Sequence, residues 1–362
     1  MTSPKVGQHE FAEFSANRFE RQKMPDRSES ERKMNHLNRL ESDGLLSICS
    51  SNTVITPDGW REARKVVQHG GNLPQSVLIV PSAGALHETF FAETWRQLPA
   101  RLAALSLMPP AGCAILCSTT EPKVQRVLQV AQTAATSFDM WRCLIELSKS
   151  GARIELLVEK TGAEFVEFQS NIAKADSSRH WLPELLSSPP RHELDWLFGE
   201  IKLARLADLC GEVASPEDAT AVLAGLWLLH GHAEQSHQSS QSIEDEGRQR
   251  SGNFWHAIMH RQEPDYFNSK YWFRRVGRHP VFSELARLAS RLIEADGSGK
   301  AQEWAQKLGL PDRFDPFVFV DWCESAARQA DSEEAFLVRQ IQFVEMHLLL
   351  RASYRDAASL NR

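Results

Sequence analysis

From about residue 194 to residue 362, the sequence is a nearly continuous series of amphipathic and apolar segments with helical spacing. Ser215 precedes Pro216, a pair typical of an N-cap and the first residue of a helix. No fixed-period repeat is visible, so the pattern predicts a C-terminal α-helical bundle domain over 194–362 and not a solenoid. The expected helices cover 194–209, 216–241, 253–261, 264–276, 281–295, 301–308 and a long pair within 316–355.

Residues 73–172 differ in character and predict a small α/β unit. Apolar, β-rich runs at 76–80, 113–117 and 153–159 alternate with helical stretches at 85–105 and 122–149. This order predicts parallel pairing, and a further run at 164–168 predicts a terminal hairpin. The turn after the first run matches neither GxGxxG nor GxxxxGK[ST], which argues against a nucleotide site. Residues 173–193, rich in Ser and Pro, predict a linker.

A polar tail over 1–29 and a segment over 30–72 precede this unit. Met34, Leu37 and Leu40 share one face of a helix expected over 30–40. The sequence LNRLESDGLLSICSSNTVITPDGWREA then gives two short strands and a helix that begins near a proline. Residues 34–67 thereby resemble part of a winged-helix domain, so the resemblance implies a small winged-helix-like segment.

Winged-helix domains bind DNA in many families and act as protein spacers in others. The expected helix carries Arg32, Lys33 and Arg39 against Glu31 and Glu41. Because phosphate neutralisation drives affinity for DNA, a DNA-facing helix should be more uniformly basic. DNA is therefore the less favoured partner. The net charge of −6 also gives the whole chain no electrostatic reason to coat nucleic acid or an anionic membrane.

The six cysteines are scattered, without the density of a disulfide framework or the spacing of a zinc site. Cys113 and Cys117 lie on one face of an apolar run, which predicts buried small hydrophobic residues. The N-terminus has no apolar core of a secretory signal, and the longest apolar run, 221–229, has nine residues. We therefore expect a cytoplasmic protein without a membrane partner; the sequence does not address its oligomeric state.

The helix expected over 216–241 changes from apolar to polar along one face. His230, Glu234, His237 and Gln241 follow one another at offsets of four, three and four residues. In the next expected helix, His256 and His260 lie one turn apart. Polar groups on a face directed at the core need partners, so these two helices predict a candidate site.

The segment Arg248–His279 is the most distinctive surface of the helical domain. It carries seven Lys and Arg residues against two acids, and seven aromatic residues are interleaved with them. The residues that we single out as ligand-binding across both features are His230, Glu234, His237, Gln241, Trp255, His256, His260, Arg261, Asn268, Lys270, Tyr271, Arg274 and Arg275.

Three interpretations of these residues remain open. In the first, the aromatic residues are core, the arginines are solvated and the histidines are satisfied interior groups. In the second, the cations hold a small anionic molecule or a nucleic-acid strand while rings stack on it. In the third, Glu234, His237, His256 and His260 hold a metal, because Glu-x-x-His is the element that helical bundles use for di-metal sites. A second such element is not visible.

The run WHAIMHRQEPDYFNSKYWFRRVGRHPVF, preceded by HGHAEQSHQSSQ, resembles the C-terminal region of a family of bacterial and fungal proteins of no known function. The resemblance covers about residues 220–350 and implies no activity, cofactor or catalytic residue. The sequence has no GxSxG, no HExxH and no cysteine in a catalytic context. If the chain is an enzyme, His237 or His260 is the expected general base, since histidine titrates near neutral pH.

Overall fold

The structure is a computed structural model. It describes residues 37–42, 45–50, 53–55, 65, 67, 76–80, 86–109, 113–118, 127, 137–151, 153–158, 166–168, 182–188, 190 and 194–358. Contacts divide the chain into Met1–Asn35 and His36–Arg362, and all described residues belong to the second unit. The tail expected over 1–29 lies outside them.

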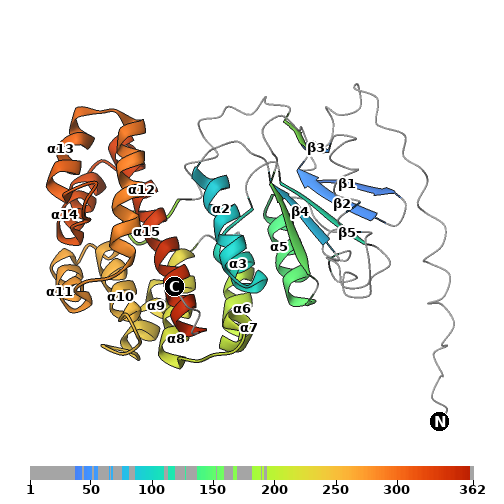
Figure 1. Ribbon diagram of the computed structural model, residues 1–362, viewed down its shortest axis with the longest axis horizontal. Coiled ribbons are helices and arrows are strands. Elements are labelled where there is room, and N and C mark those ends of the chain that lie inside the picture. The colour runs from blue at the N-terminus through green and yellow to red at the C-terminus, as the bar shows by residue number, and fades with distance from the viewer. Residues whose placement is uncertain are drawn as a thin grey trace, which may run out of the picture. The chain divides into compact units, whose positions relative to one another are not determined.

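A five-stranded sheet has the strand order β1-β2-β5-β4-β6 (Figure 1). Its strands are β1 (Leu37–Ser42), β2 (Leu45–Ser50), β5 (Ala114–Ser118), β4 (Ser76–Val80) and β6 (Ile154–Val158). Only the β4–β6 pair in this sheet is parallel, as the strand–helix pattern predicts; β5 runs antiparallel to both β4 and β2. The prediction that the strand at 113–117 pairs in parallel is therefore wrong, because an apolar run does not encode strand direction.

Two further predictions are wrong in this part of the chain. The helix expected over 30–40 is a strand from Leu37 on, because this segment pairs with β2, and ladder hydrogen bonds outweigh a weak helical spacing. The expected terminal hairpin is also absent among the described strands that follow β6. Instead β7 (Val166–Phe168) pairs antiparallel with β3 (Thr53–Ile55) in a separate two-stranded sheet. The winged-helix resemblance stays a prediction.

The helices α2 (Leu86–Gln97), α3 (Ala100–Ser106) and α5 (Ser137–Lys149) accompany the sheet, and the expected break before Pro99 is present. Burial of the sulfur atoms of Cys113 and Cys117 within this core confirms their prediction as small hydrophobic residues.

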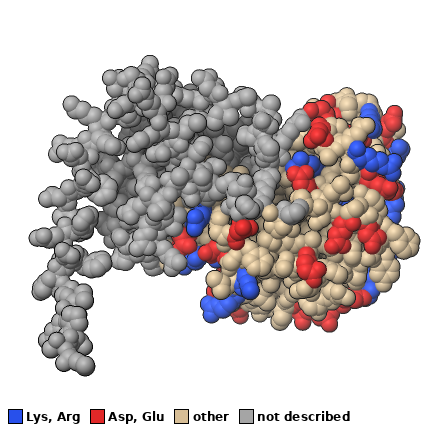
Figure 2. All heavy atoms as spheres, turned by 180° about the vertical axis from the view of Figure 1, so that it is seen from behind, with Lys and Arg blue, Asp and Glu red and all other residues tan. Residues whose placement is uncertain are grey.

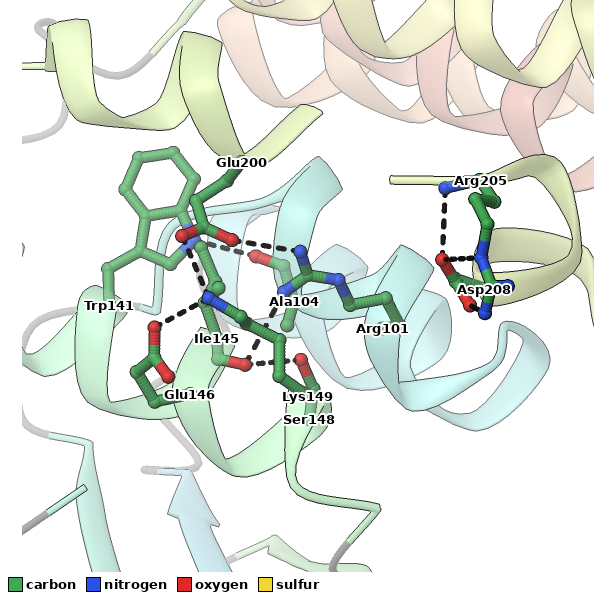
Figure 3. Close-up of polar contacts among 10 residues, drawn as sticks. All are labelled: Arg101, Ala104, Trp141, Ile145, Glu146, Ser148, Lys149, Glu200, Arg205 and Asp208. Carbon is green, nitrogen blue, oxygen red and sulfur yellow. Dashed lines mark hydrogen bonds and ion pairs between the residues drawn. The ribbon is translucent and has the colours of Figure 1, made fainter. Parts of the chain in front are cut away.

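A polar network connects these helices to the C-terminal part of the chain (Figure 3). Glu200 of α6 (Asp195–Leu203) pairs with Arg101 of α3 and with Lys149 of α5, each at 2.9 Å. Burial would raise the pKa of Glu200, but hydrogen bonds from the two cations lower it. The Trp141 indole also donates to the Ala104 carbonyl at 2.6 Å. These contacts fix α6 against α3 and α5.

The C-terminal part is helical, as predicted, and α8 to α15 form a bundle (Figure 1). After α6 come α7 (Leu206–Cys210), α8 (Pro216–Leu229), α9 (Ala233–Gln241), α10 (Ser251–Gln262), α11 (Tyr266–Val276), α12 (Val281–Asp296), α13 (Gly299–Leu308), α14 (Pro316–Ala327) and α15 (Glu333–Ala357). Ser215 caps α8 through the Asp218 N–H, which confirms the predicted start of that helix. The long helix α15 packs against α8, α12, α14 and α2, so its residues are buried on several sides. None of the helices in the described part of the chain is long and apolar enough to cross a membrane.

Two helices expected to be continuous are interrupted. The first breaks between α6 and α7, at Ala204, whose backbone is extended. The second breaks between α8 and α9, where Gly231 has a φ of 78°. This left-handed conformation suits glycine, and the N–H groups of His230 and Gly231 bond back to the last turn of α8. The second break changes the direction of the chain in the middle of the predicted site.

Candidate metal centre

Three histidines of the predicted set lie together at the contact between α9 and α10. His237 comes from α9, and His256 and His260 come from α10, where their spacing of four places them on one face. One potential ligand atom from each residue lies within 4.8 Å of the others. The rings of His256 and His260 are stacked with centroids 4.8 Å apart, and the His237 ring lies 4.7 Å from that of His256.

The two α10 histidines of the cluster are buried, and His256 has no hydrogen-bond partner among the described residues. His256 is 2% exposed, and neither of its ring nitrogens has a hydrogen-bond partner among the described residues. Trp272 of α11 also stacks on the His256 ring, with centroids 3.9 Å apart and an interplanar angle of 21°. Because a buried polar atom without a partner costs about 1–3 kcal/mol, His256 calls for a ligand or a functional explanation.

The electrostatics favour the neutral form of the two histidines on α10. Burial lowers the pKa of His256 to about 3, and neighbouring His260, His237 and Arg275 lower it further. Burial also lowers the pKa of His260, although Glu263 opposes this effect. The neutral form of imidazole carries a free lone pair, and this is the form that coordinates metal ions.

His260 has a polar neighbour at each ring nitrogen. Its Nδ1 lies 3.2 Å from a carboxylate oxygen of Glu263, and Asn268 Nδ2 lies 3.1 Å from its Nε2. A carboxylate at one nitrogen of a histidine orients the ring and raises its basicity as a ligand. Metal binding through Nε2 requires the Asn268 amide to move, and binding through Nδ1 requires the same of Glu263.

Because the helix breaks between α8 and α9, the other residues of the predicted polar face lie outside the histidine cluster. His230 lies at the end of α8, next to Trp141, and its Nε2 contacts the Leu105 carbonyl at 2.6 Å. Glu234 is exposed and accepts a hydrogen bond from Gln238 at 2.6 Å. Gln241 is exposed at the end of α9. Neither Glu234 nor His230 belongs to the metal-competent cluster that the described residues contain. The prediction of one shared face is therefore wrong.

Three of the four cations proposed to hold an anion are paired with acids of this chain. The side chains of Arg261 and Glu345 are both fully buried and in direct contact. Lys270 pairs with Asp321, and Arg275 pairs with Glu244 and Asp245. The fourth cation, Arg274, is exposed on α11.

The remaining predicted ligand residues have structural contacts. Trp255 is fully buried, and its Nε1 lies 3.3 Å from Ser353 Oγ. The Tyr271 hydroxyl accepts a hydrogen bond from Arg275 at 2.9 Å. On the face drawn in Figure 2, basic side chains lie among acidic ones.

Sequence reasoning missed Trp272, Glu263 and Glu345 as neighbours of the predicted residues. Glu263 follows His260 by three residues, so helical spacing was a signal for it. Glu345 lies 84 residues beyond Arg261, and nothing local indicates that pair.

Comparison with family models, with curated proteins and with solved structures finds no match to this chain. The resemblance of residues 220–350 to a family of bacterial and fungal proteins stays a prediction.

Proposed function

We propose that this protein binds a divalent transition-metal ion through His237, His256 and His260. The observation that carries this proposal is His256, a buried and neutral imidazole whose two nitrogens have no hydrogen-bond partner in the described part of the chain and which lies beside two further histidines. Imidazole is a preferred ligand of zinc, copper, nickel and iron, so the three side chains suit this class of metal.

Metal binding requires the ligand nitrogens of the three histidines to move closer to one another. In a tetrahedral zinc site with Zn–N bonds of about 2.0–2.1 Å, ligand nitrogens lie about 3.3 Å apart. The atoms here lie within 4.8 Å of one another, and His237 is only partly buried on a short helix. Because His237 is only partly buried, its side chain has room to move toward the α10 pair.

Three histidine ligands leave a fourth position for water or for Glu263, whose carboxylate lies 3.2 Å from His260 Nδ1. Three ligands and one open position match zinc sites that hold a reactive water more closely than closed structural sites. As ligands, His237 and His260 do not serve as the general base that the sequence suggests for an enzyme.

Binding of an anionic molecule receives less support. Arg261, Lys270 and Arg275 already contact carboxylates, so an anion would compete with intramolecular ion pairs for them.

Titration of the metal-free protein with Zn²⁺, Co²⁺ and Ni²⁺ tests the proposal by calorimetry and, for Co²⁺, by its visible spectrum. We expect one ion per chain. His237→Ala should weaken binding by more than the roughly 10–100-fold that loss of a second-shell partner costs. His232→Ala is the matched control, because His232 lies nearby at the start of α9 but outside the cluster. Absence of stoichiometric binding of all three ions, or equal affinity in wild type and His237→Ala, would overturn the proposal.

A further inference from the structure

Helix α11 has a buried face and an exposed face that carry different side chains. The buried face packs into the bundle and places Trp272 on the His256 ring. The opposite face carries Phe267, Tyr271 and Arg274, which the spacing of four and three residues aligns along the helix. Phe267 is 78% exposed and Tyr271 is 42% exposed, and no other aromatic side chain in the described part of the chain is this exposed. We call these three exposed residues the α11 surface strip.

The cations near this strip are of two kinds. Lys270 and Arg275 flank it on the helix, and both pair with acids of this chain. Arg274 and Arg278 are exposed, and neither has an acidic partner among the described residues. In a chain with a net charge of −6, two unpaired arginines beside exposed aromatic rings form a local positive surface that complements an acid.

The Tyr271 ring is restrained by contacts within the chain. Arg275 donates to its hydroxyl at 2.9 Å, and the guanidinium carbon lies 5.6 Å from the ring centroid. Arg275 is held in turn by Glu244 and Asp245. A side chain that is already ordered loses little conformational entropy when a partner binds, so this ring is suited to serve as an anchor.

The charges around the strip distinguish between possible occupants. A second copy of the same strip would bring like charges together, which costs free energy. The exposed acids Asp321, Glu244 and Asp245 border the strip through their pairs with the flanking cations, so they would repel the regular row of charges of a nucleic-acid strand or an anionic membrane. A short protein segment avoids this repulsion, because it can place one or two carboxylates on the unpaired arginines alone.

The size of the strip also favours a short segment. A stable interface between folded proteins uses about 20–30 residues on each side, whereas the strip spans two turns of one helix. Tyrosine and arginine are among the residues that dominate the binding energy of interfaces, so a few such residues can hold a short partner.

We propose that the α11 surface strip and Arg278 bind a short acidic segment of another protein. A large apolar side chain of that segment packs on Phe267 and Tyr271, and its carboxylates pair with Arg274 and Arg278 through charge-assisted hydrogen bonds. This site is independent of the metal centre proposed above, because the strip lies on the face of α11 opposite to Trp272 and the histidines.

A peptide array probed with the full chain tests the proposal. Its members combine two Glu residues with one Phe or Leu residue in every order, and matched members carry Gln in place of Glu or Ser in place of the apolar residue. We expect binding only where acids and an apolar residue are both present. A fluorescein-labelled copy of the member that binds most tightly then gives a Kd by anisotropy. Added salt should weaken this binding, since exposed charges are screened.

Two variants locate the peptide on the chain. Phe267→Ser and Arg274→Glu should each weaken binding of the labelled peptide by about tenfold or more. Leu203→Ser and Arg291→Glu are the matched controls, because these side chains are equally accessible on α6 and α12, and both controls should bind as the wild type does. All four side chains are exposed, so the circular dichroism of each variant should stay that of the wild type.

Each of the other outcomes contradicts the proposal. Absence of binding to every array member, or unchanged affinity in both Phe267→Ser and Arg274→Glu, overturns the site. Equal binding of the Glu and Gln peptides overturns the pairing with the arginines. A labelled oligothymidine that binds more tightly than the peptide and is lost in Arg274→Glu shows a nucleic-acid site in place of a protein-docking site.

Discussion

The buried ion pair between Arg261 and Glu345 should make Glu345→Gln strongly destabilising. Both side chains are fully buried, and the guanidinium also donates to Gln342 at 3.1 Å and lies 4.8 Å from the Phe319 ring centroid. Burial raises the pKa of Glu345, although Arg261 opposes this, so desolvation exceeds the attraction within the pair. Removing only the carboxylate charge leaves an uncompensated buried cation, which costs about 3–5 kcal/mol.

The double variant Arg261→Met with Glu345→Leu separates this explanation from a simple loss of contacts. It removes both charges and leaves one unpaired acceptor on Gln342, which costs about 1–3 kcal/mol. It should therefore be more stable than Glu345→Gln alone. Glu324→Gln is the control, because Glu324 forms an exposed pair with Arg328 and its loss should cost less than about 1 kcal/mol.

Urea denaturation followed by tryptophan fluorescence measures all three variants. A loss below about 1 kcal/mol for Glu345→Gln would refute the desolvation argument. So would a double variant as unstable as the single one, since the cost would then come from lost packing and not from a stranded charge.

Gly225→Ala should lose about 1–3 kcal/mol in urea denaturation, because a Cβ there would lie 2.5 Å from the Trp255 ring. Gly199→Ala, in helix α6 with open space around it, should be neutral or slightly stabilising. The folded state lowers the pKa of His347 from 6.5 to about 4, so the unfolded chain takes up the proton first as pH falls. Stability should drop by ~3 kcal/mol between these pH values, and His347→Phe should flatten that part of a melting-temperature profile. Zn²⁺ at about 100 times its Kd should stabilise the wild type by ~2.7 kcal/mol but not His237→Ala, as measured by thermal denaturation.

Local sequence signals predicted the starts of helices better than their interruptions. Ser215 and Pro216 mark the start of α8 by chemistry that acts within one turn. The break at Gly231 lies in a stretch whose two sides both have helical spacing, and it is accompanied by a contact from His230 to Leu105, 125 residues away. The spacing of residues over a few helical turns carries no information about that contact. The sequence therefore predicted one helix that continues through the break.

The same limit applies to charge. The segment Arg248–His279 has an excess of basic residues when counted alone, which favoured an anionic ligand. Its cations reach Glu244 and Asp245 just before the segment, and Asp321 and Glu345 far beyond it. Acids from other parts of the chain can therefore neutralise a local excess of basic residues. Such an excess does not by itself indicate a site for an anionic ligand.

The histidines show the opposite case. The spacing of His256 and His260 correctly placed them on one face of α10, since that relation is set by helix geometry alone. The spacing did not show that His256 lacks a hydrogen-bond partner among the described residues, because that depends on which groups the rest of the fold brings to the edge of the ring. A buried guanidinium pairs with an acid, as Arg261 does with Glu345, whereas a neutral imidazole has a lone pair that can coordinate a metal ion. This difference is our reason for proposing a metal site and not an anion site in the region of the histidine cluster.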